Sequence, residues 1–294
     1  MKKIQGKIII NAYKRPIESV RQAERLQSEF SLIGVETEII SDQIVRAGVN
    51  NGKIFTNLKN SDFIIYLDKD KYTSAVLNKL GVKTFNSHHS IRICDDKAET
   101  YIALSNSGLN LPKTLFGVLS YSEKDQISNT FLDAIEKELK YPVIVKECFG
   151  SMGKGVFIAK NRVELIELYK QVKSKPHLFQ EYLSYKKGAD VRVIVIGGKA
   201  ISAIERYNPN DFRSNVALGG SAKAVELSEE FKNSAETCAK VLGLDYCGVD
   251  LIYGDNCKPF VCEVNSNAFF EGTESATKIN VAKIYAEYVL SKLN

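Results

Sequence analysis

The sequence predicts an α/β protein, with α+β organisation in its later part, whose subdomains surround a cleft. Strand and helix patterns alternate over the first ninety residues, whereas antiparallel hairpin patterns dominate from residue 190 onward. The chain has 294 residues, 44% of them hydrophobic and 26% charged, which is an ordinary composition for a soluble globular protein. This length exceeds what one core usually serves, so we expect two or three subdomains that close over a cleft.

The first ninety residues predict a small βαβ domain with a parallel sheet. Apolar runs predict strands, and apolar residues at helical spacing predict helices. The predicted strands cover residues 7–11, 35–40, 62–67 and 82–85, and the predicted helices cover residues 16–33 and 72–80. No G-x-G-x-x-G motif follows the first strand, so a dinucleotide site is not expected there. His88 and His89 could be ligands, but a solvated loop or a helix start suits the pair better.

A glycine-rich segment, C-F-G-S-M-G-K-G-V, follows a predicted helix over residues 95–105, another over residues 131–139 and a strand over residues 142–146. It is neither a Walker loop nor a Rossmann turn, because it lies between two strands. Such a hairpin can form a flap whose backbone N–H groups face phosphate oxygens, with Lys146 supplying a fixed positive charge. A purely structural turn would look similar, so both interpretations stay open.

The middle of the chain predicts a hinge, a hairpin and a polar loop. A helix over residues 161–173 precedes H-L-F-Q-E-Y-L, a strand over residues 177–183 whose exposed backbone could read an adenine edge. A Gly-Gly turn then joins two strands within residues 190–206. The loop that follows, D-F-R-S-N-V-A-L-G-G, carries Arg213 and Asn215 and is either functional or a solvated connection.

A second hairpin, over residues 249–264, predicts a cation site. Alternation along a strand places Glu263 and Asn265 on one face, where Asp250 of the neighbouring strand can meet them. Two carboxylates and an amide oxygen suit Mg²⁺ that also bridges phosphates. The alternative is a hairpin whose polar side chains simply face water.

The net charge, the apolar run at the start and the cysteine content indicate which partners, location and cysteine chemistry to expect. The formal net charge of +5 is mild and no basic run accompanies it, so no nucleic acid is expected as a partner. The apolar run at the start stops at Asn11, too short for a signal peptide or membrane span, so we expect a cytoplasmic protein without membrane contact. Six cysteines without a C-x-x-C motif predict free thiols rather than disulfides or zinc.

Eight motifs, in order, resemble the ATP-grasp fold and specifically the RimK-type amino-acid (alpha-L-glutamate) ligases. The similarity covers roughly residues 90–294, and the motifs are Lys97, V-I-V-K ending at Lys146, G-S-M-G-K-G-V, Q-E-Y-L, A-D-V-R, D-F-R-S-N, G-V-D-L and C-E-V-N-S-N. The resemblance implies a pre-ATP-grasp βαβ domain over residues 1–94. It also implies an ATP site between two α+β subdomains, over residues 95–183 and 184–294. Members activate a carboxylate with ATP to an acyl phosphate, which an amine then displaces.

The same resemblance implies roles for individual residues. The implied ATP contacts are Lys97, Lys146, Gly150, Ser151, Met152, Gly153, Gly155, Gln180, Glu181, Tyr182, Leu183, Asp190, Arg213, Ser214 and Asn215. Among these, Lys146, Arg213 and Asn215 are the implied catalytic residues. The implied ligands of Mg²⁺, or of Mn²⁺ in its place, are Asp250, Glu263 and Asn265. The implied amino-acid substrate contacts are Arg192, Arg206, Gly219, Gly220 and Asn267.

The sequence departs from the best-known members after Asn265, where it has N-S-N-A-F-F-E-G instead of N-A-S-P-G-L. Glutamate remains the first expectation, because arginines such as Arg192 and Arg206 could pair with its carboxylates. The acceptor would be an amine, a peptide or a protein, and a homo-oligomer is left open. Two other interpretations remain, a non-catalytic nucleotide-binding regulator and a basic module for RNA.

Overall fold

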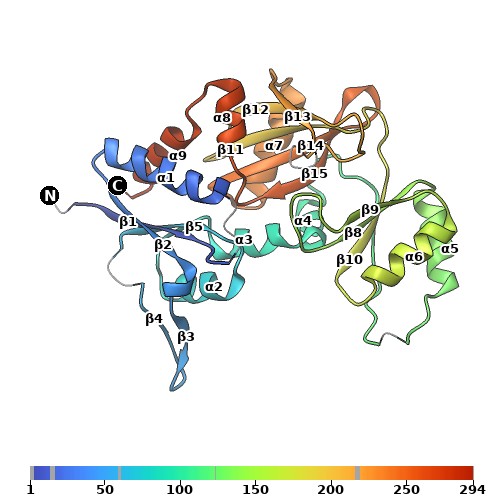
Figure 1. Cartoon of the computed structure of the whole chain (residues 1–294), viewed down its shortest axis with the longest axis horizontal. Coiled ribbons are helices and arrows are strands. Elements are labelled where there is room, and N and C mark those ends of the chain that lie inside the picture. Colours follow the sequence, from blue (N-terminus) through green and yellow to red (C-terminus); the bar gives the residue numbers. More distant parts are fainter. Residues whose placement is uncertain (1–2, 14–16, 59–60, 123, 216–218, 294) are drawn as a thin grey trace.

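The computed structural model describes residues 3–13, 17–58, 61–122, 124–215 and 219–293, and three sheets organise them (Figure 1). The first sheet is parallel throughout, as predicted. Its strands, in spatial order, are β2 (Glu36–Ser41), β1 (Gln5–Ile10), β5 (Phe63–Leu67) and β6 (Thr84–Phe85). The helices of this region are α1 (Ile17–Leu32), α2 (Lys71–Lys79) and α3 (His88–Asp95). Apolar clusters lie on both faces of the sheet, which explains its nearly continuous apolar strands.

The second sheet forms the lobe at the right of Figure 1. Its antiparallel strands are β7 (Thr114–Phe116), β10 (His177–Glu181), β8 (Val143–Glu147) and β9 (Val156–Ala159). Helices α5 (Asn129–Leu139) and α6 (Arg162–Val172) contribute leucine, isoleucine and tyrosine side chains to its core. The other face of this sheet is therefore available to form one wall of a cleft.

The third sheet is antiparallel and lies at the centre and top of Figure 1. Its strands are β13 (Ser221–Ala224), β12 (Lys199–Tyr207), β11 (Ala189–Ile196), β14 (Tyr246–Tyr253) and β15 (Pro259–Asn265). The accompanying helices are α4 (Lys97–Leu104), α7 (Glu229–Val241), α8 (Glu271–Thr277) and α9 (Val281–Ser291). Both predicted hairpins are confirmed, because β11 pairs with β12 and β14 pairs with β15.

The helix predicted over residues 95–105 is confirmed as α4. It begins at Lys97 because the side chain of Asp96 accepts the N–H groups of Ala98 and Glu99 and caps it, while Asp95 ends α3. A two-stranded hairpin, β3 (Ala47–Asn50) and β4 (Lys53–Thr56), was not predicted.

Other details refine the predicted elements. The histidine pair begins helix α3 after the cap residue Ser87, as one of the predicted alternatives had it. Pro16, the predicted start of the first helix, lies outside the described residues, as do residues 216–218 of the polar loop. All six cysteines are free thiols. Nowhere in the described ranges is a helix both long and apolar enough to cross a membrane.

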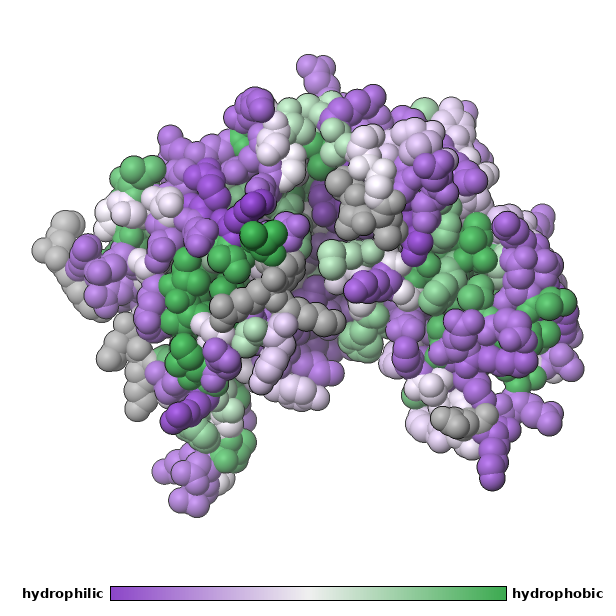
Figure 2. Space-filling view, in the orientation of Figure 1, coloured by the Kyte–Doolittle hydropathy of each residue, from purple (hydrophilic) through white to green (hydrophobic). Residues whose placement is uncertain are grey.

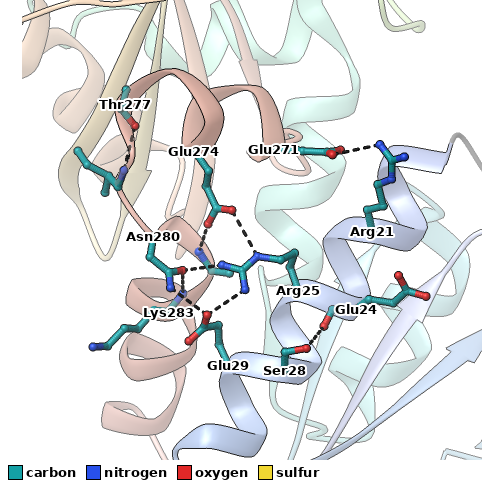
Figure 3. A network of polar contacts seen from close by, with 12 residues as sticks. Arg21, Glu24, Arg25, Ser28, Glu29, Glu271, Glu274, Thr277, Asn280 and Lys283 are labelled. Atoms are coloured by element: carbon teal, nitrogen blue, oxygen red, sulfur yellow. Dashed lines mark hydrogen bonds and ion pairs between the residues drawn. The ribbon is translucent and has the colours of Figure 1, made fainter.

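The first domain is joined to the C-terminal helices by a polar network (Figure 3). Arg25 of α1 donates to Glu29 at 2.9 Å, to Glu274 of α8 at 3.4 Å and to Asn280 at 3.0 Å. Beside this network, α1 and α9 bury a shared apolar cluster with strands β1, β5 and β11. Helix α4 likewise packs on the third sheet through Leu104. The predicted domain boundaries at residues 94 and 183 stay predictions, because apolar clusters extend across the parts that these boundaries would separate.

Candidate active site

A cleft lies between the second and third sheets, and the surface is indented between these two parts of the molecule (Figure 2). Strand β8 and the end of β10 contribute one wall, while β11, β12, β14 and β15 contribute the other. Among the predicted residues, the cleft is lined by Lys97, Lys146, Gly150, Ser151, Gly153, Gln180, Glu181, Tyr182, Leu183, Asp190, Arg206, Arg213, Ser214, Asn215, Asp250 and Glu263. Residues spread over 167 positions of sequence, from Lys97 to Glu263, are thereby brought to one place.

The glycine-rich segment forms the predicted hairpin loop between β8 and β9. Gly150, Gly153 and Gly155 have φ values of +136°, +74° and +71°, a backbone conformation that favours glycine. A Cβ on Gly155 would also stand 3.1 Å from the side chain of Glu147. The loop therefore needs these glycines for its own shape.

Two cationic side chains donate hydrogen bonds to backbone carbonyls of the loop. Lys97 donates from Nζ to the carbonyl of Gly150 at 3.0 Å and lies 3.6 Å from a carboxylate oxygen of Glu263. Arg213 donates from Nη1 to the carbonyl of Gly153 at 2.9 Å, and Asp211 accepts two further bonds from the same guanidinium at 3.0 and 2.8 Å. Both cations line the same cleft as Gly150 and Gly153 of the loop.

Lys146 lies at the floor of the cleft and is 6% exposed. Burial by itself would lower the pKa of this ammonium, but Cys262, Tyr101 and Glu263 outweigh it and raise the pKa above its ordinary value. Gln180 accepts a hydrogen bond from Nζ at 2.7 Å. The site therefore carries a fixed positive charge in a position shielded from water.

The predicted hinge differs in detail from its expected form. Strand β10 ends at Glu181, so Tyr182 and Leu183 lie beyond it and line the cleft. The backbone N–H of Glu181 donates to the carbonyl of Lys113 at 3.0 Å, and its carboxylate accepts from the N–H of Lys113 at 2.7 Å. The N–H and the carboxylate of Glu181 are therefore both paired with Lys113.

Four charged residues on three neighbouring strands form an ion-pair network in which all but Arg192 are buried. Asp250 of β14 accepts two hydrogen bonds from Arg192 of β11, both of 2.7 Å, and lies 2.9 Å from Arg206 of β12. Arg206 also binds Asp190 through two hydrogen bonds. Burial raises the pKa of Asp250, but the two arginines outweigh it, so its pKa lies below the ordinary value. The predicted substrate contacts Arg192 and Arg206 are thus held by protein carboxylates.

The predicted cation ligands lie on paired strands. Asp250 and Glu263 are directly opposite in the β14–β15 register, and Asn265 lies opposite Gly248. Asp250 Oδ2 accepts from both arginines, whereas Oδ1 accepts from Arg192, which leaves a lone pair on Oδ1 in this set of contacts. The side chain of Glu263 is 24% exposed. Two carboxylates on paired strands are ligands of the kind that Mg²⁺ takes, and among the described residues no larger cluster of metal-binding side chains occurs.

The remaining predicted residues do not line the cleft in the described structure; they are Met152, Gly155, Arg192, Gly219, Gly220, Asn265 and Asn267. Asn267 keeps a buried Oδ1 atom without a hydrogen-bond partner among the described residues. This acceptor lies in the segment after Asn265 where the sequence differs from the N-A-S-P-G-L pattern.

Sequence reasoning missed several residues of the lining: Ile144, Lys154, Val156, Lys186, Gly188, Ala189, Phe212, Ile252, Tyr253 and Cys262. Most are apolar or lie in predicted strands and flank a predicted site residue by one or two positions. Strand alternation offered a signal for Ile144 and Ile252, which share a face with Lys146 and Asp250. Apolar walls of this kind suit a planar base.

Comparison with solved structures defines the class. The fold is that of the ATP-grasp ligases: the structure of ATP-grasp ligase PsnB complexed with a phosphomimetic variant of its minimal precursor, Mg and ADP matches with a TM-score of 0.71 and 16% identity. That match covers 99% of both chains.

Sequence comparison defines the family. The RimK-like ATP-grasp domain model matches residues 94–289, and this chain belongs to that family. A probable alpha-L-glutamate ligase of Psychromonas ingrahamii is 32% identical over 298 residues, covering 96% of this chain and 94% of the relative. Beta-citrylglutamate synthase B of Danio rerio is 35% identical over 228 residues, 77% of this chain. The chain spans only 55% of that protein's length. The resemblance predicted from the motifs is thereby confirmed.

Proposed function

We propose that this chain is an ADP-forming carboxylate–amine ligase that joins an amino acid to an amine, peptide or protein acceptor. The observation that carries the proposal is the convergence of Lys97, Lys146 and Arg213 with the glycine loop on the cleft that also holds Asp250 and Glu263. Three cations and two carboxylates match the needs of phosphoryl transfer from a metal-bound nucleotide, in which catalysis is mainly positioning and charge stabilisation.

In the proposed reaction a substrate carboxylate oxygen attacks the terminal phosphorus of ATP. The bond to the bridging oxygen breaks, and ADP leaves with the electron pair. The amine then attacks the acyl phosphate, loses a proton and expels phosphate, which forms the amide. Mg²⁺, when bound, would neutralise charge on the phosphates. Lys146 and Arg213 would hold the transferring oxygens, while Asn215 would contact the acyl phosphate.

We infer that the activated or added amino acid is glutamate or a close analogue. Two relatives carry names that concern glutamate, the probable alpha-L-glutamate ligase and the beta-citrylglutamate synthase. The arginines Arg192 and Arg206 support the inference less than the sequence suggested, because both are paired with Asp250. The buried acceptor of Asn267 is a second candidate contact, since an unpaired buried oxygen favours a donor such as an ammonium group.

The proposal also covers the cellular location, the metal ion and the oligomeric state. Free thiols at all six cysteines are typical of a reducing compartment, which supports a cytoplasmic location. An oxygen-rich ligand set also accepts Mn²⁺, so we propose that Mn²⁺ can replace Mg²⁺. Assembly into homo-oligomers would be decided by a measurement of mass in solution.

An ADP-release screen tests the proposed function. The purified chain is incubated with Mg-ATP and each of the twenty amino acids, alone and with citrate, N-acetylaspartate, short peptides or a second amino acid as co-substrate. We expect ADP release that requires both substrates and is greatest with glutamate. Nucleotide binding without ADP release across the whole screen would favour the non-catalytic regulator and contradict the proposal.

A further inference from the structure

The ammonium of Lys146 is held by a side chain of the cleft wall. Nζ donates to Oε1 of Gln180 at 2.7 Å, and both residues line the cleft. Tyr101 lies behind them, outside the described lining, and its hydroxyl donates to the carbonyl of Cys262 at 2.7 Å. An ammonium has three N–H donors. One of them is therefore aimed at a defined acceptor, which restricts the directions of the other two.

The amide of Gln180 can present either its oxygen or its nitrogen to Lys146, and a third residue decides which. Gln180 lies directly opposite Thr114 in the β10–β7 register, and its Nε2 donates to the Thr114 hydroxyl at 2.8 Å. That hydroxyl donates in turn to the carbonyl of Pro112 at 2.8 Å. Because its proton is committed to Pro112, Thr114 can only accept from Gln180. The amide oxygen is thereby turned toward Lys146.

We propose that Thr114 is a positioning residue for the nucleotide phosphates, acting through Gln180 on the Lys146 ammonium. Neither Thr114 nor Tyr101 is among the described residues that line the cleft, whereas Gln180 and Lys146 both are. Gln180 is 2% exposed, so a wrongly turned amide would oppose its own N–H groups to a buried cation with little water to compensate. The proposal rests on the proposed function, in which Lys146 contacts the phosphates of ATP.

Calorimetric titration with two ligands tests it. Mg-ATP reports on the phosphate contacts, and adenosine reports on the base pocket alone. Thr114→Val keeps the shape but removes both hydrogen bonds of the hydroxyl, and Thr114→Ser restores them. We expect Thr114→Val to weaken Mg-ATP about tenfold, the scale of one lost buried hydrogen bond, and to leave adenosine unchanged. Thr114→Ser should bind Mg-ATP like the wild type.

A matched control is available on the first sheet. Thr37 of β2 has a buried hydroxyl without a hydrogen-bond partner among the described residues, so Thr37→Val should bind both ligands normally. If Thr114→Val does not fold, Gln180→Met removes the same acceptor from Lys146 and should show the same selective loss of Mg-ATP affinity.

Three results would overturn the inference: unchanged Mg-ATP affinity in Thr114→Val, equal losses for Mg-ATP and adenosine, or a loss that serine does not restore. These measurements need no amino acid and no acceptor. Wild-type protein that binds Mg-ATP but fails every ADP-release assay would therefore contradict the ligase proposal and leave the role of Thr114 to be judged from binding. Wild-type protein that binds no Mg-ATP would contradict both.

Discussion

Arg192 and Asp250 lie directly opposite each other on strands β11 and β14 and share two hydrogen bonds of 2.7 Å. The pair connects the candidate cation site to the interior of the third sheet, since Asp250 is 3% exposed and also meets Arg206. A carboxylate expected to bind a metal is thus at the same time the counter-charge of the buried Arg206 and the half-buried Arg192.

This double role predicts different behaviour for the two carboxylates. Asp250→Asn and Glu263→Gln should both abolish Mg²⁺-dependent ADP formation. Asp250→Asn should in addition lower the free energy of unfolding by about 3 kcal/mol, because removing one partner leaves buried guanidinium groups uncompensated. Glu263→Gln, whose side chain is 24% exposed, should unfold like the wild type. Urea titration and ADP assays measure both effects, and equal stability of the two variants would be inconsistent with the observed network.

Arg213→Ala should lower kcat by about 10²-fold, since one charge-assisted contact to a developing anion is lost. The variant also releases the carbonyl of Gly153, so the affinity for Mg-ATP should change as well. Arg92→Ala serves as the control, because Arg92 pairs with Glu99 on the protein surface and lies outside the described cleft lining. Turnover of Arg213→Ala within threefold of the wild type would remove Arg213 from the proposed mechanism.

Single replacements of Cys148, Cys257 and Cys262 by alanine should preserve turnover, because the proposed acyl phosphate forms without a protein nucleophile. Cys257 is exposed in the turn between β14 and β15, whereas burial raises the pKa of the Cys148 thiol to about 12. Hydroxylamine should trap the intermediate as a hydroxamate when the amine is withheld. A covalent enzyme adduct that disappears in one of these variants would refute the free acyl phosphate.

Glu205 predicts a pH dependence of stability. Burial would raise the pKa of this carboxyl, but Lys186, Tyr253 and Lys223 outweigh it and lower the pKa from 4.5 to about 2. A lowered folded-state pKa stabilises the fold above pH 4.5, and this contribution is lost as the pH falls toward 2. The difference in unfolding free energy between wild type and Glu205→Gln should therefore shrink across this range. A constant difference from pH 6 to pH 3 would show that the pKa of Glu205 is not lowered.

Gly117→Ala should destabilise the second lobe, because a Cβ at this position would lie 2.0 Å from the imidazole of His177. His177 is buried against Tyr169 and Phe179, so it has little room to move. Overpacking of this kind costs about 1–3 kcal/mol. Gly272→Ala is the control, since a Cβ there meets nothing within 4 Å and Gly272 lies within helix α8. Equal melting temperatures for the two variants would contradict the steric argument.

The sequence predicted the order of strands and helices because most strands are apolar runs bounded by glycine, proline or asparagine. The β3–β4 hairpin escaped because Val49, Ile54 and Phe55 are its only large apolar residues and two of them are exposed. Asn51 and Gly52, with φ values of +49° and +73°, form its turn, and this Asn-Gly pair was the signal that could have revealed it.

The motifs of the candidate site could be predicted from the sequence, but the ion-pair partners of their charged residues could not. Each motif lies on or beside a strand that the sequence marks clearly, so the convergence on one cleft follows once the strands pair. The contact of Asp250 with both Arg192 and Arg206 depends instead on the register of the three strands β12, β11 and β14, and an irregularity after Ile194 shifts the pairing of β11 with β12. The apolar runs of these strands did not mark that shift, so the sequence did not predict which charged residues meet.

Because α1 and α9 pack against each other, removing the first domain from the chain would uncover apolar side chains of the C-terminal helices. A fragment with only residues 94–289, the part that the family model matches, would keep almost the whole cleft. It would also expose Phe270, Tyr285 and Val289, which are 1%, 2% and 0% exposed in the whole chain. Contiguous apolar surface of that kind promotes aggregation. The segment that the family model matches therefore lacks part of its own apolar core, which α1, β1 and β5 of the first domain supply.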